Sequence, residues 1–161
     1  MEILFTIDES SLAFLNTRPA GEWNEADIRR LVYGAIELVD GGSRIAGETS
    51  LIEWLTDFAW ITVVSDDAAT NREVLVADTE GEFGVFVYRD GLSIALRNWL
   101  SKAPDIVTSS VALHEAVGSA VKDLRRLLEP RFTRPELITR LRRCDELLAQ
   151  DPPDTGSSTR R

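Results

Sequence analysis

The stretch EVLVADTEGEFGVFVYRDGLSIALRNW, residues 73–99, decides the fold because it contains three runs that are typical of β-strands. The dipeptides Glu80-Gly81 and Asp90-Gly91 separate these runs, and a glycine that follows an acidic residue is common in tight hairpin turns. The alternation of strand-like runs and turns predicts a three-stranded antiparallel meander.

The positions of the two turns predict which side chains share a face of the meander. A turn at 80–81 pairs Val76 with Val85, and a turn at 90–91 pairs Val87 with Ile94. One face is then apolar and is expected to join the core: Val74, Val76, Val85, Val87, Ile94 and Leu96. The opposite face contains Leu75, Ala77, Gly84, Phe86, Tyr88, Ser93, Ala95 and Arg97.

This opposite face is also apolar at its centre, which leaves two interpretations. Either residues 8–27 or the last helix covers it, as in sheets that are buried on both sides, or it is an exposed patch that binds a partner. We expect coverage, with the exposed patch as the alternative.

Upstream of the meander, the sequence predicts three further strands. Residues 2–7, EILFTI, form a short strand, and residues 28–39 form a long strand that is apolar on both faces. A strand of this kind is typical of the interior of a sheet that is covered on both sides. The turn DGG at 40–42 leads into a short returning strand at 43–47.

Three helices are predicted from the spacing of apolar residues. Residues 48–60 form the first, with Thr49 or Ser50 as its cap, and the following ITVV either ends it or begins a strand. After a break at 101–105, residues 109–129 form a long helix with an apolar stripe, and residues 133–150 form another. The apolar stripes are Leu51, Leu55 and Phe58; Leu113, Val117, Ala120, Val121, Leu124 and Leu128; and Leu137, Leu141, Cys144 and Leu148.

These elements predict one α+β domain over residues 1–150, followed by a disordered tail at 151–161. Strands that are followed by helices indicate an antiparallel sheet of about five or six strands with helices packed on it. Residues 65–73 are expected to be a polar loop.

The charge of the chain, −9 overall, limits its partners. Residues 1–120 contain 20 acidic and 8 basic side chains, whereas residues 121–161 contain 7 acidic and 10 basic ones. An acidic body is unsuited to nucleic acid, because neutralising phosphates requires clustered Lys and Arg, but it suits a basic protein partner. A single cysteine and the absence of an apolar run of about 20 residues favour a protein of the cytoplasm with no membrane span.

His114 and Glu115 begin a sequence that resembles the zinc-protease motif H-E-x-x-H, but the fifth position is Gly118. Because the chain has no second histidine, the motif is incomplete, and we expect His114 to be a structural residue. Cys144 lies on an apolar stripe, where a thiol is usually inert, so a His114–Cys144 dyad is the less favoured interpretation. We predict no catalytic residue, no metal site and no cofactor, although the turn carboxylates leave magnesium binding open.

Three sequence motifs and a helix follow one another in an order that resembles a known class of proteins. The strand ending IELVDGG, the helix with LIEWL and the meander GEFGVFVYRDGLSIALRNW are followed by a long amphipathic helix. This arrangement, over residues 28–129, resembles the small acidic α+β immunity proteins of bacterial polymorphic and contact-dependent toxin systems. The resemblance implies a non-enzymatic protein that binds a basic toxin or enzyme and blocks its site, with acidic turns around an aromatic patch. The candidate partner-binding residues are Asp66, Asp67, Glu80, Glu82, Phe86, Tyr88, Asp90 and Arg97.

Two other functions stay open. The first is a small-ligand-binding or weakly catalytic domain with a pocket between sheet and helices, lined by Tyr33, Trp54, Arg97 and His114. The second is a homodimer, in place of a monomer, that forms through the face with Phe86 and Tyr88.

Overall fold

The protein is described by a computed structural model. The structure describes residues 1–11, 13, 32–64, 73–77, 83–102, 104–128 and 135–150, with the side chains of 135–138 left out. Of the loop expected at 65–73, residues 65–72 lie outside the described residues, as does the tail at 151–161, whereas Glu73 belongs to a strand.

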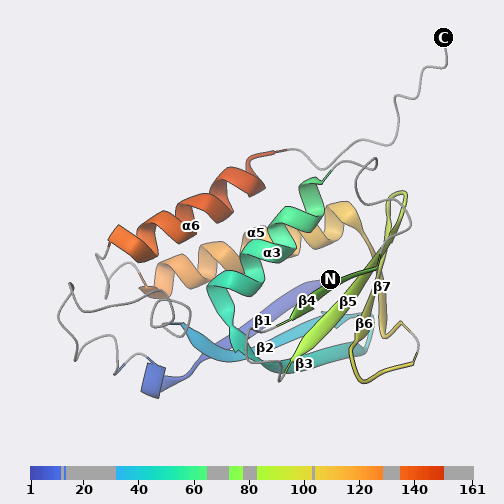
Figure 1. The fold of residues 1–161 in the computed structure, drawn as a ribbon, viewed down its shortest axis with the longest axis horizontal. Coiled ribbons are helices and arrows are strands. Elements are labelled where there is room, and N and C mark those ends of the chain that lie inside the picture. Colours follow the sequence, from blue (N-terminus) through green and yellow to red (C-terminus); the bar gives the residue numbers. More distant parts are fainter. Residues whose placement is uncertain are drawn as a thin grey trace, which may run out of the picture.

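Two antiparallel sheets and the helices α3, α5 and α6 make up most of the described residues and form an α+β fold, as predicted (Figure 1). The first sheet has the order β1 (Glu2–Ile7), β2 (Tyr33–Asp40), β3 (Ser43–Ser50). The second sheet has the order β4 (Glu73–Ala77), β5 (Gly84–Asp90), β6 (Ser93–Asn98), β7 (Ile106–Ser109). The helices are α3 (Leu51–Val63), α5 (Ser110–Leu128) and α6 (Pro135–Leu148).

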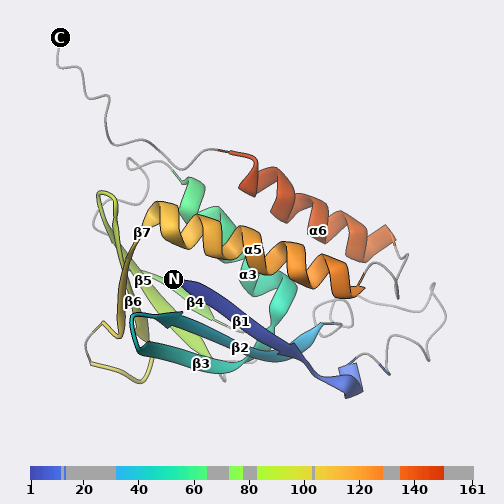
Figure 2. The ribbon, with the colours of Figure 1, turned by 180° about the vertical axis from the view of Figure 1, so that it is seen from behind.

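The helices form layers on the first sheet. Helices α3 and α5 lie over it, and α6 lies on α3 and α5 on the side away from this sheet (Figures 1 and 2). The second sheet stands at one end of these layers and contributes to the same hydrophobic core. The single sheet of five or six strands was therefore a wrong prediction, because the seven described strands are divided between two sheets.

The two sheets meet at an aromatic contact in the core. Phe83, immediately before β5, packs on Gly47 of β3, where an added Cβ would lie 2.1 Å from the phenyl ring. The Phe83 ring also stacks on Trp54 of α3, with 5.8 Å between ring centroids, and Trp54 in turn contacts Phe58. The absence of a side chain at Gly47 thus lets the second sheet pack closely on the first.

The predicted faces of the meander are confirmed, although one of its two registers is wrong. Val76 pairs with Val85 as expected, but Val87 pairs with Leu96 instead of Ile94. The turn consists of Gly91 and Leu92, with a φ of +58° at Gly91, which fits the preference of two-residue hairpin turns for glycine. The shift along β6 is two residues, and because side chains alternate with a period of two, every side chain keeps its predicted face.

Strand β7 was missed by the sequence analysis. It follows the predicted break, pairs with β6 and continues into α5 at Ser110 without a loop. A four-residue strand directly before a helix has too few residues to show alternation, so periodicity could not distinguish it from a loop.

The strands of the first sheet correct two further predictions. β2 is the central strand of this sheet, but it is buried on only one face, since Ile36 and Leu38 are buried while Ala35 is exposed. β3 extends to Ser50, and the expected cap by Thr49 or Ser50 is not made. The backbone carbonyl of Val32 instead accepts a hydrogen bond from the amide of Leu51, the first residue of α3.

The apolar stripes of the helices are largely confirmed. All the stripe residues of α3 and α5 are buried, and α3 continues through Ile61 and Thr62 to Val63, so the sequence ITVV does not begin a strand. In α6, Leu141 and Cys144 are buried.

Candidate binding surface

The side of the second sheet that faces away from the helices is exposed, and we call it the outer face. Its members come from alternate positions of the four strands, together with Trp99, which follows β6: Glu73, Leu75, Ala77, Gly84, Phe86, Tyr88, Asp90, Ser93, Ala95, Arg97, Trp99, Val107 and Ser109. Leu75 is 46% exposed, Tyr88 41% and Val107 64%, and no element within the described ranges covers them. The expectation that another element covers this face is therefore not met by the part of the chain that the structure describes.

Cross-strand pairing arranges the outer face in rows. One row runs from Glu73 through Tyr88 and Ala95 to Val107, and the next contains Leu75, Phe86 and Arg97. Beyond these rows, Leu75 and Trp99 flank Gly84, where an added Cβ would lie 3.1 Å from Leu75 and 3.6 Å from Trp99. The outer face is thus a mostly apolar strip that also contains the charged pair Glu73 and Arg97.

Arg97 is held in place on this strip by three contacts. Its guanidinium lies 4.4 Å from the centroid of the Phe86 ring, a cation–π geometry. Its Nη2 lies 2.5 Å from the Glu73 carboxylate, and its Nη1 donates a hydrogen bond to the Ser101 carbonyl at 2.8 Å. Since Glu73 balances the charge of Arg97, the middle of the outer face carries no net charge.

Asp105 fixes the beginning of the connection between β6 and β7, of which the structure describes residues 99–102, 104 and 105. The Asp105 carboxylate accepts hydrogen bonds from the Asn98 amide at 2.8 Å and from the Ser101 hydroxyl at 3.1 Å. These bonds hold Asn98 and Ser101 in place on either side of Leu100, which is 83% exposed. An exposed leucine therefore lies next to this end of the sheet.

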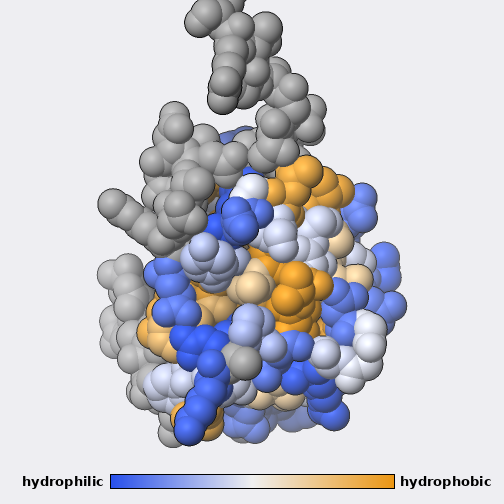
Figure 3. Space-filling view, turned by 90° about the vertical axis from the view of Figure 1, so that its right-hand side faces the viewer, coloured by the Kyte–Doolittle hydropathy of each residue, from blue (hydrophilic) through white to orange (hydrophobic). Residues whose placement is uncertain are grey.

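Exposed apolar residues are concentrated on this side of the molecule. Ten large apolar side chains are exposed in the described part of the chain. Four of them belong to the outer face (Leu75, Tyr88, Trp99 and Val107), and two lie at its ends (Leu92 and Leu100). The space-filling view shows a central apolar area bordered by hydrophilic residues (Figure 3). A contiguous apolar patch with a polar rim is typical of a protein interaction site.

The structure places half of the predicted partner-binding residues together. Phe86, Tyr88, Asp90 and Arg97 share the outer face, whereas Asp66, Asp67, Glu80 and Glu82 lie outside the described residues. Val107 and Leu100 were not predicted, because a strand as short as β7 shows no alternation and the sequence does not indicate that a leucine in a loop is exposed.

His114 joins three helices. Its Nδ1 lies 2.9 Å from the Thr62 hydroxyl of α3, and its Nε2 lies 3.2 Å from the Leu148 carbonyl of α6. A carbonyl oxygen accepts but does not donate, so Nε2 carries a proton, while the single hydrogen of the Thr62 hydroxyl has two acceptors within reach, Nδ1 and the Ala59 carbonyl at 2.8 Å. Both nitrogens therefore have a partner in the helix interface, consistent with the structural role expected from the incomplete motif. Within the described ranges, no three His, Cys, Asp or Glu side chains lie close enough together to hold a metal.

Cys144 is buried in α6, and burial raises the pKa of its thiol to about 11, with a smaller opposing effect from a hydrogen bond to Thr56. Only about one thiol in a thousand is then ionised at pH 8, and the thiolate is the reactive form. We expect iodoacetamide to modify the folded protein at pH 8 at least 100-fold more slowly than it modifies the protein in denaturant, as followed by mass spectrometry. Modification at equal rates would show that the thiol is accessible.

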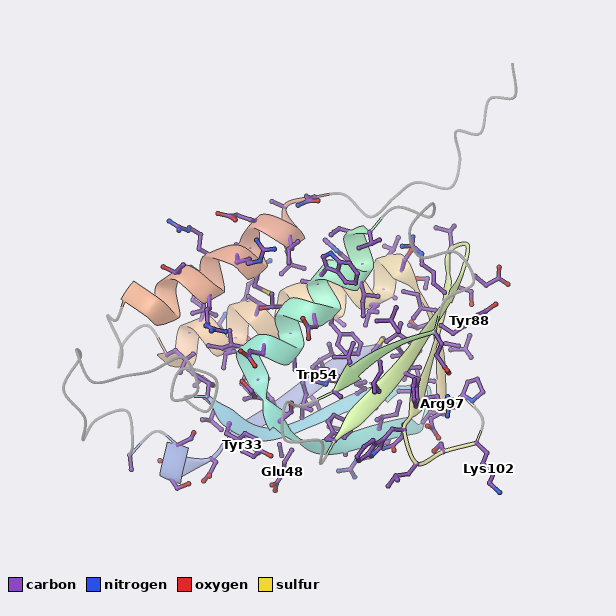
Figure 4. All side chains as sticks on the ribbon, in the orientation of Figure 1. Tyr33, Glu48, Trp54, Tyr88, Arg97 and Lys102 are labelled. Carbon is purple, nitrogen blue, oxygen red and sulfur yellow. The ribbon has the colours of Figure 1, made fainter. Side chains whose placement is uncertain are left out.

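The residues expected to line a ligand pocket do not converge. Trp54 lies in the core, Tyr33 lies at the start of β2, and Arg97 lies on the outer face (Figure 4). Two open hollows of about 400 and 350 Å³ follow the seam between α3 and α6. In the smaller one, desolvation and then the neighbouring Glu53 raise the pKa of Asp57, while Glu53 itself pairs with Arg140 at 2.7 Å.

None of the described helices is long and apolar enough to cross a membrane. No family model, no curated protein and no solved structure matches this chain.

Proposed function

We propose that this protein is a non-enzymatic binding protein that holds a basic protein partner across the outer face of its second sheet. The observation that carries the proposal is the clustering of exposed large apolar side chains on that face and at its two ends. The role that fits it best is that of an immunity protein of the cytoplasm, which blocks the site of a toxin or enzyme by occupying it.

The composition of the outer face suits protein recognition. Tyrosine, tryptophan and arginine are enriched among the residues that contribute most to binding, and Tyr88, Trp99 and Arg97 all lie here. Each strand of the second sheet is anchored by its inner side chains in the core, so the outer face is presented on a rigid support.

The charge of the chain supports a basic partner. The sequence on either side of β4 is acidic, with Asp66 and Asp67 before the strand and Asp78, Glu80 and Glu82 after it. Opposite charges around an apolar centre accelerate association and select the partner, while the apolar centre supplies most of the affinity.

The proposal can be tested with the product of the neighbouring reading frame, where an immunity protein has its toxin. We expect a one-to-one complex by light scattering and survival of cells that express both proteins. Because the attraction is partly electrostatic, the complex should weaken when NaCl is raised from about 50 to about 500 mM. Neither complex nor protection would reject the immunity role.

Two leucines with nearly equal exposure provide a matched pair for locating the surface. Leu75→Glu places a charge on the outer face, on its edge strand β4, whereas Leu127→Glu places the same charge on α5, and the two side chains are 46% and 48% exposed. We expect Leu75→Glu to weaken partner binding at least 10-fold, measured by calorimetry, while Leu127→Glu leaves binding unchanged. Equal binding by both variants would show that the partner does not use the outer face.

A further inference from the structure

We infer that, without its partner, the protein is a reversible homodimer in which the outer faces of two copies cover each other. The occupant of the face is then a second copy of this chain. The inference concerns the free protein, so it does not depend on the existence of the basic partner.

Local charge makes the outer face the surface where two like-charged copies can approach. The chain carries a net charge of −9, so most relative orientations of two copies are repulsive. On the outer face and in the described part of the connection, residues 99–102, 104 and 105, however, there are three acidic and two basic side chains, because Arg89 is buried on the opposite face: Glu73, Asp90, Asp105, Arg97 and Lys102. The strands of the first sheet contain four acidic residues and one basic residue: Glu2, Glu37, Asp40, Glu48 and Arg44. The apolar surface is thus also the less acidic of the two sheets, with one net negative charge against three.

The two ends of the outer face are complementary under two-fold symmetry. Asp90 lies at the hairpin end of the sheet, and Lys102 lies in the connection at the opposite end; Figure 4 shows Tyr88, Arg97 and Lys102 along this side of the molecule. A two-fold axis that lies between the sheets and crosses the strands brings the hairpin end of one copy over the opposite end of the other. Asp90 of each copy then faces the end that carries Lys102 of its partner, and the apolar rows pack on each other.

The size of the face indicates a weak dimer. Four strands about 4.8 Å apart and about six residues long cover roughly 20 Å by 20 Å, or about 400 Å². A stable interface buries about 800 Å² on each partner, so the sheet alone supplies about half of that area. Leu92 and Leu100, which extend the strip at its two ends, add to the contact. We therefore expect monomer and dimer to exchange at micromolar concentrations rather than a permanent dimer.

The effect of salt on association distinguishes the homodimer from a complex with a basic partner. Two copies with the same net charge repel each other, so added NaCl should strengthen the dimer, whereas it should weaken a complex with a basic partner. Since both associations use the outer face, partner and second copy exclude each other.

Sedimentation velocity of the purified full chain between about 5 and about 500 µM tests the inference. We expect the weight-average mass to rise from monomer towards dimer, and the dimer dissociation constant to fall several-fold between about 50 and about 500 mM NaCl. Leu75→Glu should stay monomeric throughout this range, because each dimer would bury two added carboxylates, and Leu127→Glu should dimerise like the unchanged protein. Circular dichroism melts of both variants establish that they are folded.

Three results would overturn the dimer: a free protein that stays monomeric at the highest concentration, a Leu75→Glu variant that still dimerises, or a dimer that salt dissociates. A monomeric free protein that binds its partner would remove only the dimer. A dimer with no partner in the neighbouring reading frame would remove only the immunity role.

Discussion

Replacing Gly47 with alanine is expected to lower the free energy of unfolding by about 3 kcal/mol, because it inserts a methyl group into a filled part of the core. The new Cβ would lie 2.1 Å from the ring of Phe83, which is 3% exposed. The ring cannot move aside easily because it stacks on Trp54. For a chain of this length we expect a melting temperature roughly 6–12 °C lower, measured by circular dichroism or calorimetry.

Gly118 provides the control, because the same glycine-to-alanine substitution there should raise the free energy of unfolding instead of lowering it. It lies inside α5, and no atom lies within 4 Å of the position that its Cβ would occupy. Because alanine is the better helix former, Gly118→Ala should stabilise the protein by about 0.5–1 kcal/mol.

A double-mutant cycle identifies the clash at Gly47. If the phenyl ring is the obstacle, the loss in the free energy of unfolding caused by Gly47→Ala should be at least about 1 kcal/mol smaller when Phe83 is already alanine. Additive effects of the two substitutions would show that the destabilisation has another origin.

Arg89→Ala is expected to destabilise the protein by about 3 kcal/mol, because it removes a buried cation that satisfies two backbone carbonyls. Arg89 is 2% exposed; its Nη1 donates to the Val64 carbonyl at 2.8 Å and its Nε to the Gly91 carbonyl at 3.1 Å. Val64 follows α3, whose last turn has no basic residue of its own. Arg89 of β5 therefore supplies the positive charge that favours a helix C-terminus.

Arg44 is the matched control for this substitution, and urea unfolding gives both values. Arg44 is 64% exposed and pairs with Glu37 at 2.6 Å, so Arg44→Ala should change the free energy of unfolding by at most about 0.5 kcal/mol. Arg89→Met, which restores most of the volume without the donors, should recover only part of the loss. A loss at Arg89 no larger than the loss at Arg44 would contradict the structural role of this cation.

At Arg89, the alternation of side chains along the strand predicts the buried face correctly, although arginine is a residue type that is usually exposed. The pattern of β5 places position 89 on the same face as Val85 and Val87, and the structure confirms that face as buried. An arginine on a core face is unexpected because an unpaired buried charge is costly. The carbonyls that make its burial acceptable come from the end of α3 and from a turn, and no sequence pattern predicts that these segments meet.

The remaining errors arise from the same difference between local and long-range information. The faces of the meander follow from a period of two within each strand, so they were predicted correctly even where the register of β6 was wrong. The division into two sheets and the position of α6 depend on contacts between distant segments, such as Phe83 on Gly47. The exposure of Leu75 and Tyr88 likewise depends on which other elements reach them, which their own strands do not encode.

Alternation along the strands of the second sheet also has an evolutionary consequence. Val85 and Val87 are fixed by the core, whereas Phe86 and Tyr88, their immediate neighbours in the chain, lie on the opposite side. Natural selection can therefore change the outer face at every second position of a strand while the positions between them keep the domain folded. If the partner's sequence diversifies rapidly, the outer residues can be substituted one at a time in response. A combinatorial library restricted to those positions would sample new binding specificities on an unchanged scaffold.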